Sequence, residues 1–302
     1  MQIERVPRFR KNEWGACFYD DIKTIAYYYG EDYELLALKS LRFNIDLKKT
    51  LWSSLVFNDP LFYNLNQYIG LNLVRNFDVN SLIKKYNKGT DALAIIEVAS
   101  FYWPGSPDFK NPKKRNAKHY IILGEMFDSN FSFVDPYYKT KHIYNIDILF
   151  NAFQSYYEVR HVKHQSNSIR YIQNNILKDV KETLKDLYIM QKQIKVSSAK
   201  ETDVVDIEEV SMNFADGMEL YLAMLEKYFP TIINTSIMND SIRMILRWQN
   251  IRKNWVKNWD LKNVDNRMRL NNEGFSIVDS MINIFKDIIL FLRGVIGEIS
   301  SK

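Results

Sequence analysis

The 302-residue sequence predicts an α+β protein in which a mixed N-terminal half precedes a helical C-terminal half. Two observations predict this division. Up to about residue 163, helical periodicity alternates with short apolar runs, whereas from about residue 165 apolar residues recur at helical spacing between polar joints. A hydrophobic content of 46% and a charged content of 25% are typical of a globular chain. We therefore expect two domains, over residues 1–163 and 164–302, with the additional C-terminal helical region packed on the first domain.

Helical and strand-like segments alternate along the first half of the chain. Apolar or aromatic residues lie on one helical face of Cys17–Tyr29, and Gly30 follows where a helix C-terminal cap is expected. The other elements expected here are a short helix at 34–43 and strands at 92–99, 119–123, 131–134 and 157–162. The second and third of these strands flank a turn at 128–130, so they predict an antiparallel hairpin.

The second half is expected to form four helices separated by polar joints. They are predicted at 175–194, 207–228, 238–255 and 274–296, and Pro230 ends the second of them. The most apolar stretch, 280–299, contains three charged residues well inside it: Lys286, Asp287 and Arg293. Because each charge would be costly at the centre of a bilayer, we expect a core helix rather than a membrane span. The same apolar helix is a candidate face for a homodimer.

Composition limits the classes of function and partner. The net charge of +5 is too small to predict nucleic-acid binding by itself, although it favours an acidic partner. Basic and aromatic residues interleave over 241–259, but the apolar spacing there favours helix packing over nucleic-acid binding. The single cysteine suits a reducing compartment, and the first residues lack the apolar core of a secretory signal. We expect a soluble cytoplasmic protein that binds neither nucleic acid nor membrane.

Cys17 is the candidate nucleophile. It stands in the first turn of the first predicted helix, where backbone N–H groups and the helix dipole are expected to stabilise a thiolate and lower the thiol pKa. Asp20 and Asp21, one turn further on, suit a helix N-terminus but would oppose thiolate formation. A free cysteine is more often a small buried apolar residue, so Cys17 alone does not predict catalysis.

His119 and Asp135 complete a pattern around this cysteine. His119 begins a short apolar strand after a polar loop, and nucleophilic cysteine chemistry needs a base that removes the thiol proton. Asp135 ends the next predicted strand, 16 residues later. Because the start of one hairpin strand faces the end of its partner, Asp135 is expected beside His119, where a carboxylate would orient the imidazole. The alternatives are a solvated histidine and an ordinary Asp-Pro turn.

Two runs of sequence resemble a known family. Trp14–Gly30 resembles the cysteine-bearing first helix of the butirosin-biosynthesis acyltransferase N-terminal domain, which has a papain-like cysteine-protease fold. Lys118–Pro136 resembles the histidine hairpin of the same group, in which a strand beginning with histidine leads to one ending in Asp-Pro. The order and spacing of these motifs extend the resemblance over roughly the first 160 residues.

The resemblance implies an activity. The butirosin enzyme moves an acyl group from a carrier-protein thioester to an amine, and a similar cysteine-protease homologue of closthioamide (polythioamide) biosynthesis forms amide bonds between carrier-bound intermediates. By resemblance, Cys17 would be the nucleophile, His119 the base and Asp135 the orienting acid of an acyltransferase or amide synthase of secondary metabolism. Its partners would be an acyl or peptidyl carrier protein bearing 4′-phosphopantetheine and a small or carrier-bound amine. No bound cofactor is expected, and the sequence has no phosphate-binding glycine-rich loop for ATP-dependent ligation.

The sequence also departs from the papain-like pattern. Papain-like peptidases usually carry a glutamine several residues before the cysteine as an oxyanion donor, and none stands here. Asn12, five residues upstream of Cys17, is the nearest amide and is the oxyanion candidate, with an ordinary loop residue as the alternative. Two other functions stay open. A cysteine peptidase of related fold would use the same acyl-enzyme, and a non-catalytic binding module could have inherited the fold.

A basic loop immediately precedes His119. Residues 110–118 carry five basic side chains and no acid: Lys110, Lys113, Lys114, Arg115 and Lys118. Either this loop is simply solvated, or it docks the acidic carrier protein and the phosphate of its phosphopantetheine arm. Among the other histidines, His142 is expected in an exposed turn, and His161 and His164 are expected to be exposed. No metal site is predicted, because the two histidines have no nearby cysteine partner.

Overall fold

The computed structural model describes residues 17–38, 63–87, 93–127, 129–138, 140–162, 167–197, 207–258 and 264–300. The chain divides into two compact units, and the predicted α+β class is confirmed by a sheet in the first and helices in both. Unit 1 holds the described residues of 17–33 and 65–162. Unit 2 holds 34–38, 63–64 and the described residues from 167 onward, so it is not continuous in sequence.

Unit 1 is built on a six-stranded antiparallel sheet. In spatial order its strands are β1 (Leu71–Asn76), β6 (Phe153–His161), β2 (Ala94–Ala99), β3 (Lys118–Phe127), β4 (Asn130–Asp135) and β5 (Thr140–Asn145). The predicted hairpin is present as β3 and β4, which pair Ile122 with Val134 and Leu123 with Phe133. The sequence did not predict β1 and β5, because neither contains a long apolar run: β1 has exposed residues at its second and fifth positions, and β5 alternates half-buried residues with exposed ones.

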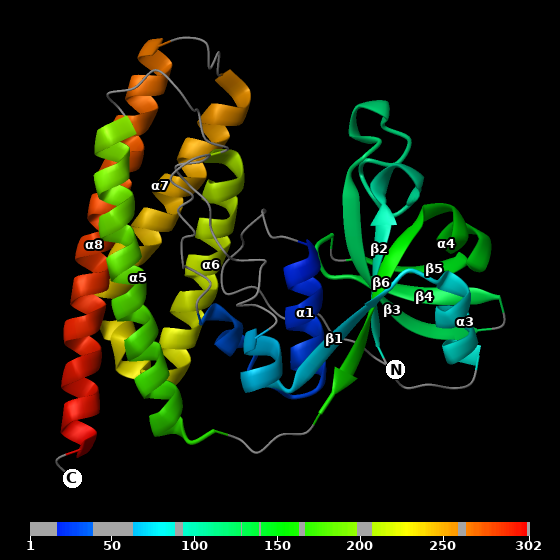
Figure 1. Cartoon of the computed structure of the whole chain (residues 1–302), viewed down its shortest axis with the longest axis horizontal. Coiled ribbons are helices and arrows are strands. Elements are labelled where there is room, and N and C mark those ends of the chain that lie inside the picture. The colour runs from blue at the N-terminus through cyan, green and yellow to red at the C-terminus, as the bar shows by residue number, and fades with distance from the viewer. Residues whose placement is uncertain are drawn as a thin grey trace. The chain divides into compact units, whose positions relative to one another are not determined.

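The two faces of this sheet pack against different helices. On one face, Ile96 of β2 and Ile121 of β3 form a buried core with α3 (Val79–Asn87) and α4 (Ile146–Ala152). The residues that alternate with them point to the opposite face, where α1 (Cys17–Tyr28) contacts β3. Figure 1 shows α1 on one side of the sheet and α3 with α4 on the other. The sheet therefore has a helix on each side, and α1 brings its first residue to β3.

The predicted first helix is confirmed. Ile22, Ile25 and Ala26 bury its apolar face, and Gly30 follows it with a φ of +74°, a left-handed conformation that glycine adopts at low cost. The short helix expected at 34–43 is a 3₁₀ turn over Tyr33–Ala37, and residues 39–43 of that prediction fall outside the described residues.

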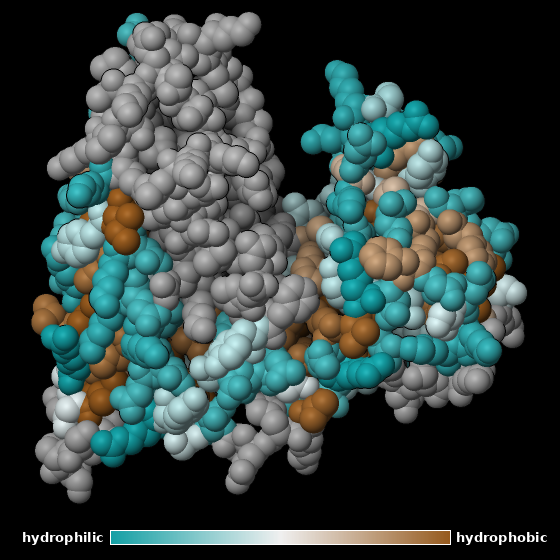
Figure 2. All heavy atoms as spheres, viewed as in Figure 1, coloured by the Kyte–Doolittle hydropathy of each residue, from teal (hydrophilic) through white to brown (hydrophobic). Residues whose placement is uncertain are grey.

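Unit 2 contains the four predicted helices; the second has the predicted bounds, and the other three are longer than their sequence patterns indicated. They are α5 (Ile169–Ser197), α6 (Ile207–Tyr228), α7 (Ser236–Asn258) and α8 (Val264–Ser300). Helix α8 packs against α5 and α7, and Met281, Phe285 and Leu292 are buried there, so the core-helix interpretation is confirmed. In the described helices, no segment has the length and apolar character needed to cross a bilayer. In Figure 2 the coloured surface of these helices is mainly hydrophilic, interrupted by small apolar groups.

Candidate active site

His119 and Asp135 form a buried hydrogen-bonded pair in unit 1. His119 is the second residue of β3, Asp135 is the last residue of β4, and the Nε2 atom of His119 lies 2.6 Å from Oδ2 of Asp135. The two residues are only 3% and 1% exposed. The structure therefore brings together the two side chains that the hairpin register predicted. Because a carboxylate only accepts hydrogen bonds, this contact puts a proton on Nε2 and leaves Nδ1 as the free ring nitrogen.

The turn after β4 adds contacts that the sequence did not predict. The backbone N–H of Tyr138 donates to Oδ1 of Asp135 at 3.0 Å, so each carboxylate oxygen has a donor. The rings of Tyr138 and Tyr137 lie 5.0 and 6.1 Å from the imidazole of His119. The sequence signal for the backbone contact was the Asp-Pro pair at Asp135, because an aspartate at the start of a turn often accepts a hydrogen bond from a backbone N–H of that turn. These contacts hold the imidazole and the carboxylate in one orientation.

Cys17 begins α1 and lies against the strand that carries His119. The residue is half-buried, and its thiol is hydrogen-bonded to the backbone N–H of Tyr120, the residue after His119. The ring of Phe18 packs at 4.9 Å from Tyr120 and at 5.0 Å from Tyr157, which fixes the start of the helix on the sheet. The nucleophile candidate is therefore at the same end of β3 as the His119–Asp135 pair.

The expected lowering of the thiol pKa is wrong. Burial first, and then the negative charges that Asp21 and Asp135 carry when they are ionised, raise the pKa of Cys17 to about 12. Hydrogen bonds from the backbone N–H groups of Tyr120 and Phe18 lower the pKa, but they do not outweigh these effects. A helix terminus contributes only about 0.3–1 kcal/mol, less than the loss of solvation of a buried anion. The resting group is thus a neutral thiol, and it needs a base to lose its proton.

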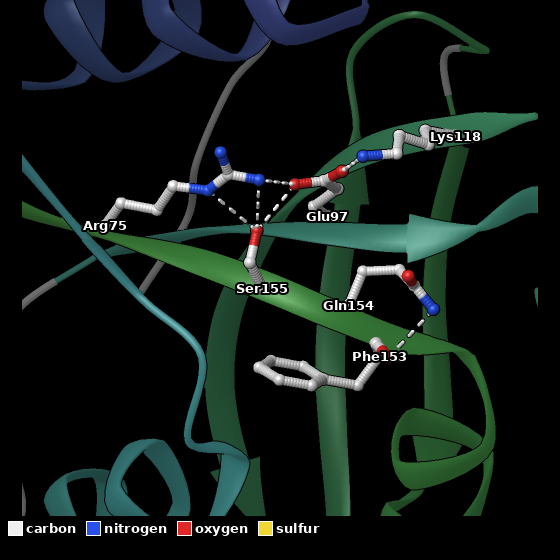
Figure 3. Close-up of polar contacts among 6 residues, drawn as sticks. All are labelled: Arg75, Glu97, Lys118, Phe153, Gln154 and Ser155. Atoms are coloured by element: carbon white, nitrogen blue, oxygen red, sulfur yellow. Dashed lines mark hydrogen bonds and ion pairs between the residues drawn. The ribbon is translucent and has the colours of Figure 1, made fainter.

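Glu97 anchors a polar cluster on the α1 face of the sheet. Figure 3 shows this carboxylate between Arg75 and Ser155 on one side and Lys118 on the other. Its Oε2 lies 2.6 Å from Arg75 Nη2 and 2.6 Å from Ser155 Oγ, and its Oε1 lies 2.5 Å from Lys118 Nζ. These four residues come from four neighbouring strands, β1, β6, β2 and β3. Since Lys118 directly precedes His119, the Glu97 cluster fixes the start of β3.

Burial by itself would raise the pKa of Glu97. The hydrogen bonds from Lys118 and Ser155 and the charges of Lys118 and Arg75 outweigh it and hold the pKa below its usual value. Glu97 is fully buried, whereas the side chains of Arg75 and Lys118 are 42% and 56% exposed. Sequence reasoning missed this cluster, because its members are spread over residues 75–155 and no short-range spacing connects them.

The predicted docking residues are exposed, but they do not form a uniform set. Lys110, Lys113, Lys114 and Arg115 lie in an exposed loop that contains a 3₁₀ turn at Pro112–Lys114. Lys118 differs, because its charge is paired with Glu97. The oxyanion candidate Asn12 lies outside the described residues.

Two histidines are placed differently from what the sequence suggested. His142 lies in β5 instead of an exposed turn, half-buried, with its ring stacked on Tyr144. His161 ends β6, where its ring stacks on Tyr29 and its Nε2 lies 2.7 Å from Oε1 of Glu31, while His164 is outside the described residues. Within the described ranges, no group of three histidine, cysteine or acidic residues has the geometry of a metal site.

The chemistry that this arrangement can perform is nucleophilic. A thiol, a histidine with one free ring nitrogen and a carboxylate on the other nitrogen are the groups needed to form and resolve an acyl-enzyme. Comparisons with known proteins give no match, either to a family model or to a curated protein sequence.

Proposed function

We propose that unit 1 is a papain-like cysteine acyltransferase that moves an acyl group from a carrier-protein thioester to an amine. The observation that carries the proposal is the buried His119–Asp135 bond at 2.6 Å, next to a thiol that is hydrogen-bonded to Tyr120. The antiparallel sheet with a cysteine at the start of its packing helix supports a papain-like fold. The motif resemblance to the butirosin-biosynthesis acyltransferase domain supports the same assignment.

In the proposed first step, Nδ1 of His119 takes the proton of the Cys17 thiol as the sulfur attacks the thioester carbonyl carbon. Because the thiol pKa is raised to about 12, proton removal accompanies the attack and does not precede it. The tetrahedral intermediate collapses by breaking the carbon–sulfur bond to the carrier, and the leaving pantetheine sulfur receives the proton from His119. Exchange of one thioester for another is close to isoenergetic, so a carrier thioester is a suitable donor.

In the second step, an amine attacks the carbonyl of acyl-Cys17. His119 accepts the proton that the amine nitrogen loses, the carbon–sulfur bond breaks, and the sulfur takes this proton back as the free thiol. The products are an amide and the regenerated enzyme. Asp135 stabilises the imidazolium that forms in both steps and keeps Nδ1 directed to the reaction.

The exposed basic loop supports a carrier protein as the donor. Its four cations, Lys110, Lys113, Lys114 and Arg115, are exposed in the residues just before His119. Acyl carrier proteins are acidic and present a phosphate on their prosthetic arm, and both features favour a basic surface.

Intact-mass measurement tests the proposal. Incubation with an acyl-loaded carrier protein should add one acyl group to the wild-type chain, and Cys17→Ala should add none. Supplying an amine should then release an amide. Free acid in place of amide would identify a peptidase or thioesterase of the same mechanism. Amide formation that survives in Cys17→Ala would refute the proposal, and an unmodified wild-type thiol would favour a non-catalytic binding module.

A further inference from the structure

Asp21 is a fully buried acid that the proposed reaction does not use. It stands one helical turn after Cys17 on α1, and its exposed fraction is 0%. Neither of its carboxyl oxygens has a hydrogen-bond partner in the described part of the chain. A carboxylate held away from water without a donor is unfavourable by several kcal/mol, so a buried acid of this kind adopts its neutral form.

The groups that face Asp21 are themselves acidic. On α1 they are Cys17 and Asp20, and from the end of β4 it is Asp135, which is bonded to His119. Asp20 is paired with Lys23 at 2.7 Å, but no cation is paired with Asp21 among the residues described. Burial first, and then the charges of Asp135 and Asp20, raise the pKa of Asp21 well above its usual range.

Hydrogen bonding decides which of the two buried carboxyls near the thiol holds a proton. Asp135 accepts one bond on each oxygen, from His119 and from the backbone of Tyr138, and these donors favour its ionised form. Asp21 has no donor and the same low-dielectric surroundings, which favour its protonated form. Two neighbouring carboxyls in unequal environments are a common basis for separate roles in one site.

We propose that Asp21 is a positioning residue of this site, which keeps the thiol ionisable by remaining a neutral acid one turn away from it. This inference rests on the proposed function, because the reaction that Asp21 would influence is the acyl transfer at Cys17. With Asp21 neutral, Asp135 is the negative neighbour of Cys17, and the imidazolium that His119 becomes on taking the thiol proton compensates it. Loss of the Asp21 proton would place an uncompensated negative charge beside the sulfur and oppose thiolate formation. Asp21 therefore sets an alkaline limit on the nucleophile.

The test is the pH dependence of Cys17 alkylation by iodoacetamide in the wild type and in Asp21→Asn, which mimics the neutral acid. At low pH the two rates should agree within about twofold, and at high pH the variant should react about tenfold faster, as expected for one charge removed at short range. Asp147→Asn, which removes an exposed acid in the first turn of α4, is the matched control. Asp147 is a source of neither the Cys17 nor the Asp21 pKa shift, so this variant should follow the wild-type curve.

Two results would overturn the proposal. A variant that is faster by the same factor at every pH would show that Asp21 is already ionised in the resting protein. Curves that superimpose over the whole range would show that its charge does not reach the thiol.

Stability gives a second readout that needs no reactive thiol. Because the pKa of Asp21 is raised on folding, the folded protein retains a proton that the unfolded chain gives up above about pH 4. Wild-type stability should therefore fall relative to Asp21→Asn as the pH rises above that value, and a difference independent of pH would contradict the assignment.

If the variant does not fold, infrared spectra of the wild type at neutral pH should retain the carbonyl band of a protonated carboxylic acid, and its absence would overturn the proposal. None of these measurements uses an acyl donor, so they remain decisive even if the proposed acyl transfer fails.

Discussion

Replacing Asp135 by asparagine removes the charge that orients His119 and leaves the size of the side chain unchanged. In the structure one oxygen of Asp135 accepts from Nε2 of His119 at 2.6 Å and the other from the backbone of Tyr138 at 3.0 Å. An asparagine can offer its oxygen to only one of these two donors, so its NH₂ group, itself a donor, must face the other. The residue is 1% exposed, so water cannot easily relieve the conflict.

The size of the effect follows from the two orientations of the amide. If the oxygen faces Tyr138, the NH₂ group donates to Nε2, and the His119 proton moves to Nδ1, which can then no longer accept the thiol proton. If the oxygen faces His119, the N–H of Tyr138 is left unsatisfied, at about 1–3 kcal/mol. That energy corresponds to roughly a 5- to 150-fold loss of the active orientation. Because the imidazolium also loses its counter-charge, we expect a total loss of roughly 10²- to 10⁴-fold.

The assay is the rate of acyl-adduct formation on Cys17, followed by intact mass. Nitrogen-15 NMR of the His119 ring would report the change of tautomer directly. Asp147→Asn is a matched control, since Asp147 is an exposed acid in the first turn of α4, and it should stay within about twofold of wild type. A folded Asp135→Asn protein that reacts within about threefold of wild type would refute the role given to this carboxylate.

Two further predictions concern the Glu97 cluster and the basic loop. Glu97→Gln should lower the free energy of unfolding by about 1–3 kcal/mol near neutral pH, because Arg75 and Lys118 lose their shared carboxylate. Since the pKa of Glu97 is lowered on folding, this contribution exists above its unfolded value of about 4.3 and disappears as the pH falls through the folded value. A difference in unfolding free energy, measured in urea, that is unchanged between pH 7 and pH 3 would contradict this. Glu158→Gln, whose carboxylate is less buried, should lower the free energy of unfolding by less. The double variant Lys113→Glu, Lys114→Glu should raise the KM for an acyl-carrier donor by about tenfold at low salt and by less at high salt. The control Lys178→Glu, at an exposed position of α5, should leave this KM unchanged. A rise in KM that does not depend on salt would exclude electrostatic docking.

The elements that the sequence predicted are those with a local signal. Helix α1 shows its apolar face within Cys17–Tyr28, and the β3–β4 hairpin shows two apolar runs around a short turn. Strand β5 was missed, since Thr140–Asn145 lies at the sheet edge and needs only alternate residues to be buried. Its residue His142 was therefore assigned to a turn.

The contact between His119 and Asp135 was also predictable from a local signal. His119 and Asp135 lie on adjacent strands of one hairpin. The register that pairs Ile122 with Val134 continues to Asp135 opposite Ile121, so His119 is a diagonal neighbour whose side chain reaches the carboxylate. The charge state of Cys17 did not follow in the same way. Its position at a helix start indicated a lowered thiol pKa, and the structure reverses the sign because burial and nearby acids act more strongly than the helix dipole.

The sequence by itself determined the α+β class, the helices of the second half and the order of Cys17, His119 and Asp135 along the chain. Periodicity and turn chemistry act over a few residues, and they are therefore visible in one dimension. Only the tertiary structure decided that Asp21 is buried without a donor, that Glu97 joins four strands, and that Lys118 is paired while its basic neighbours are exposed. Desolvation and charge pairing depend on which distant segments surround a side chain, and those neighbours are set by packing.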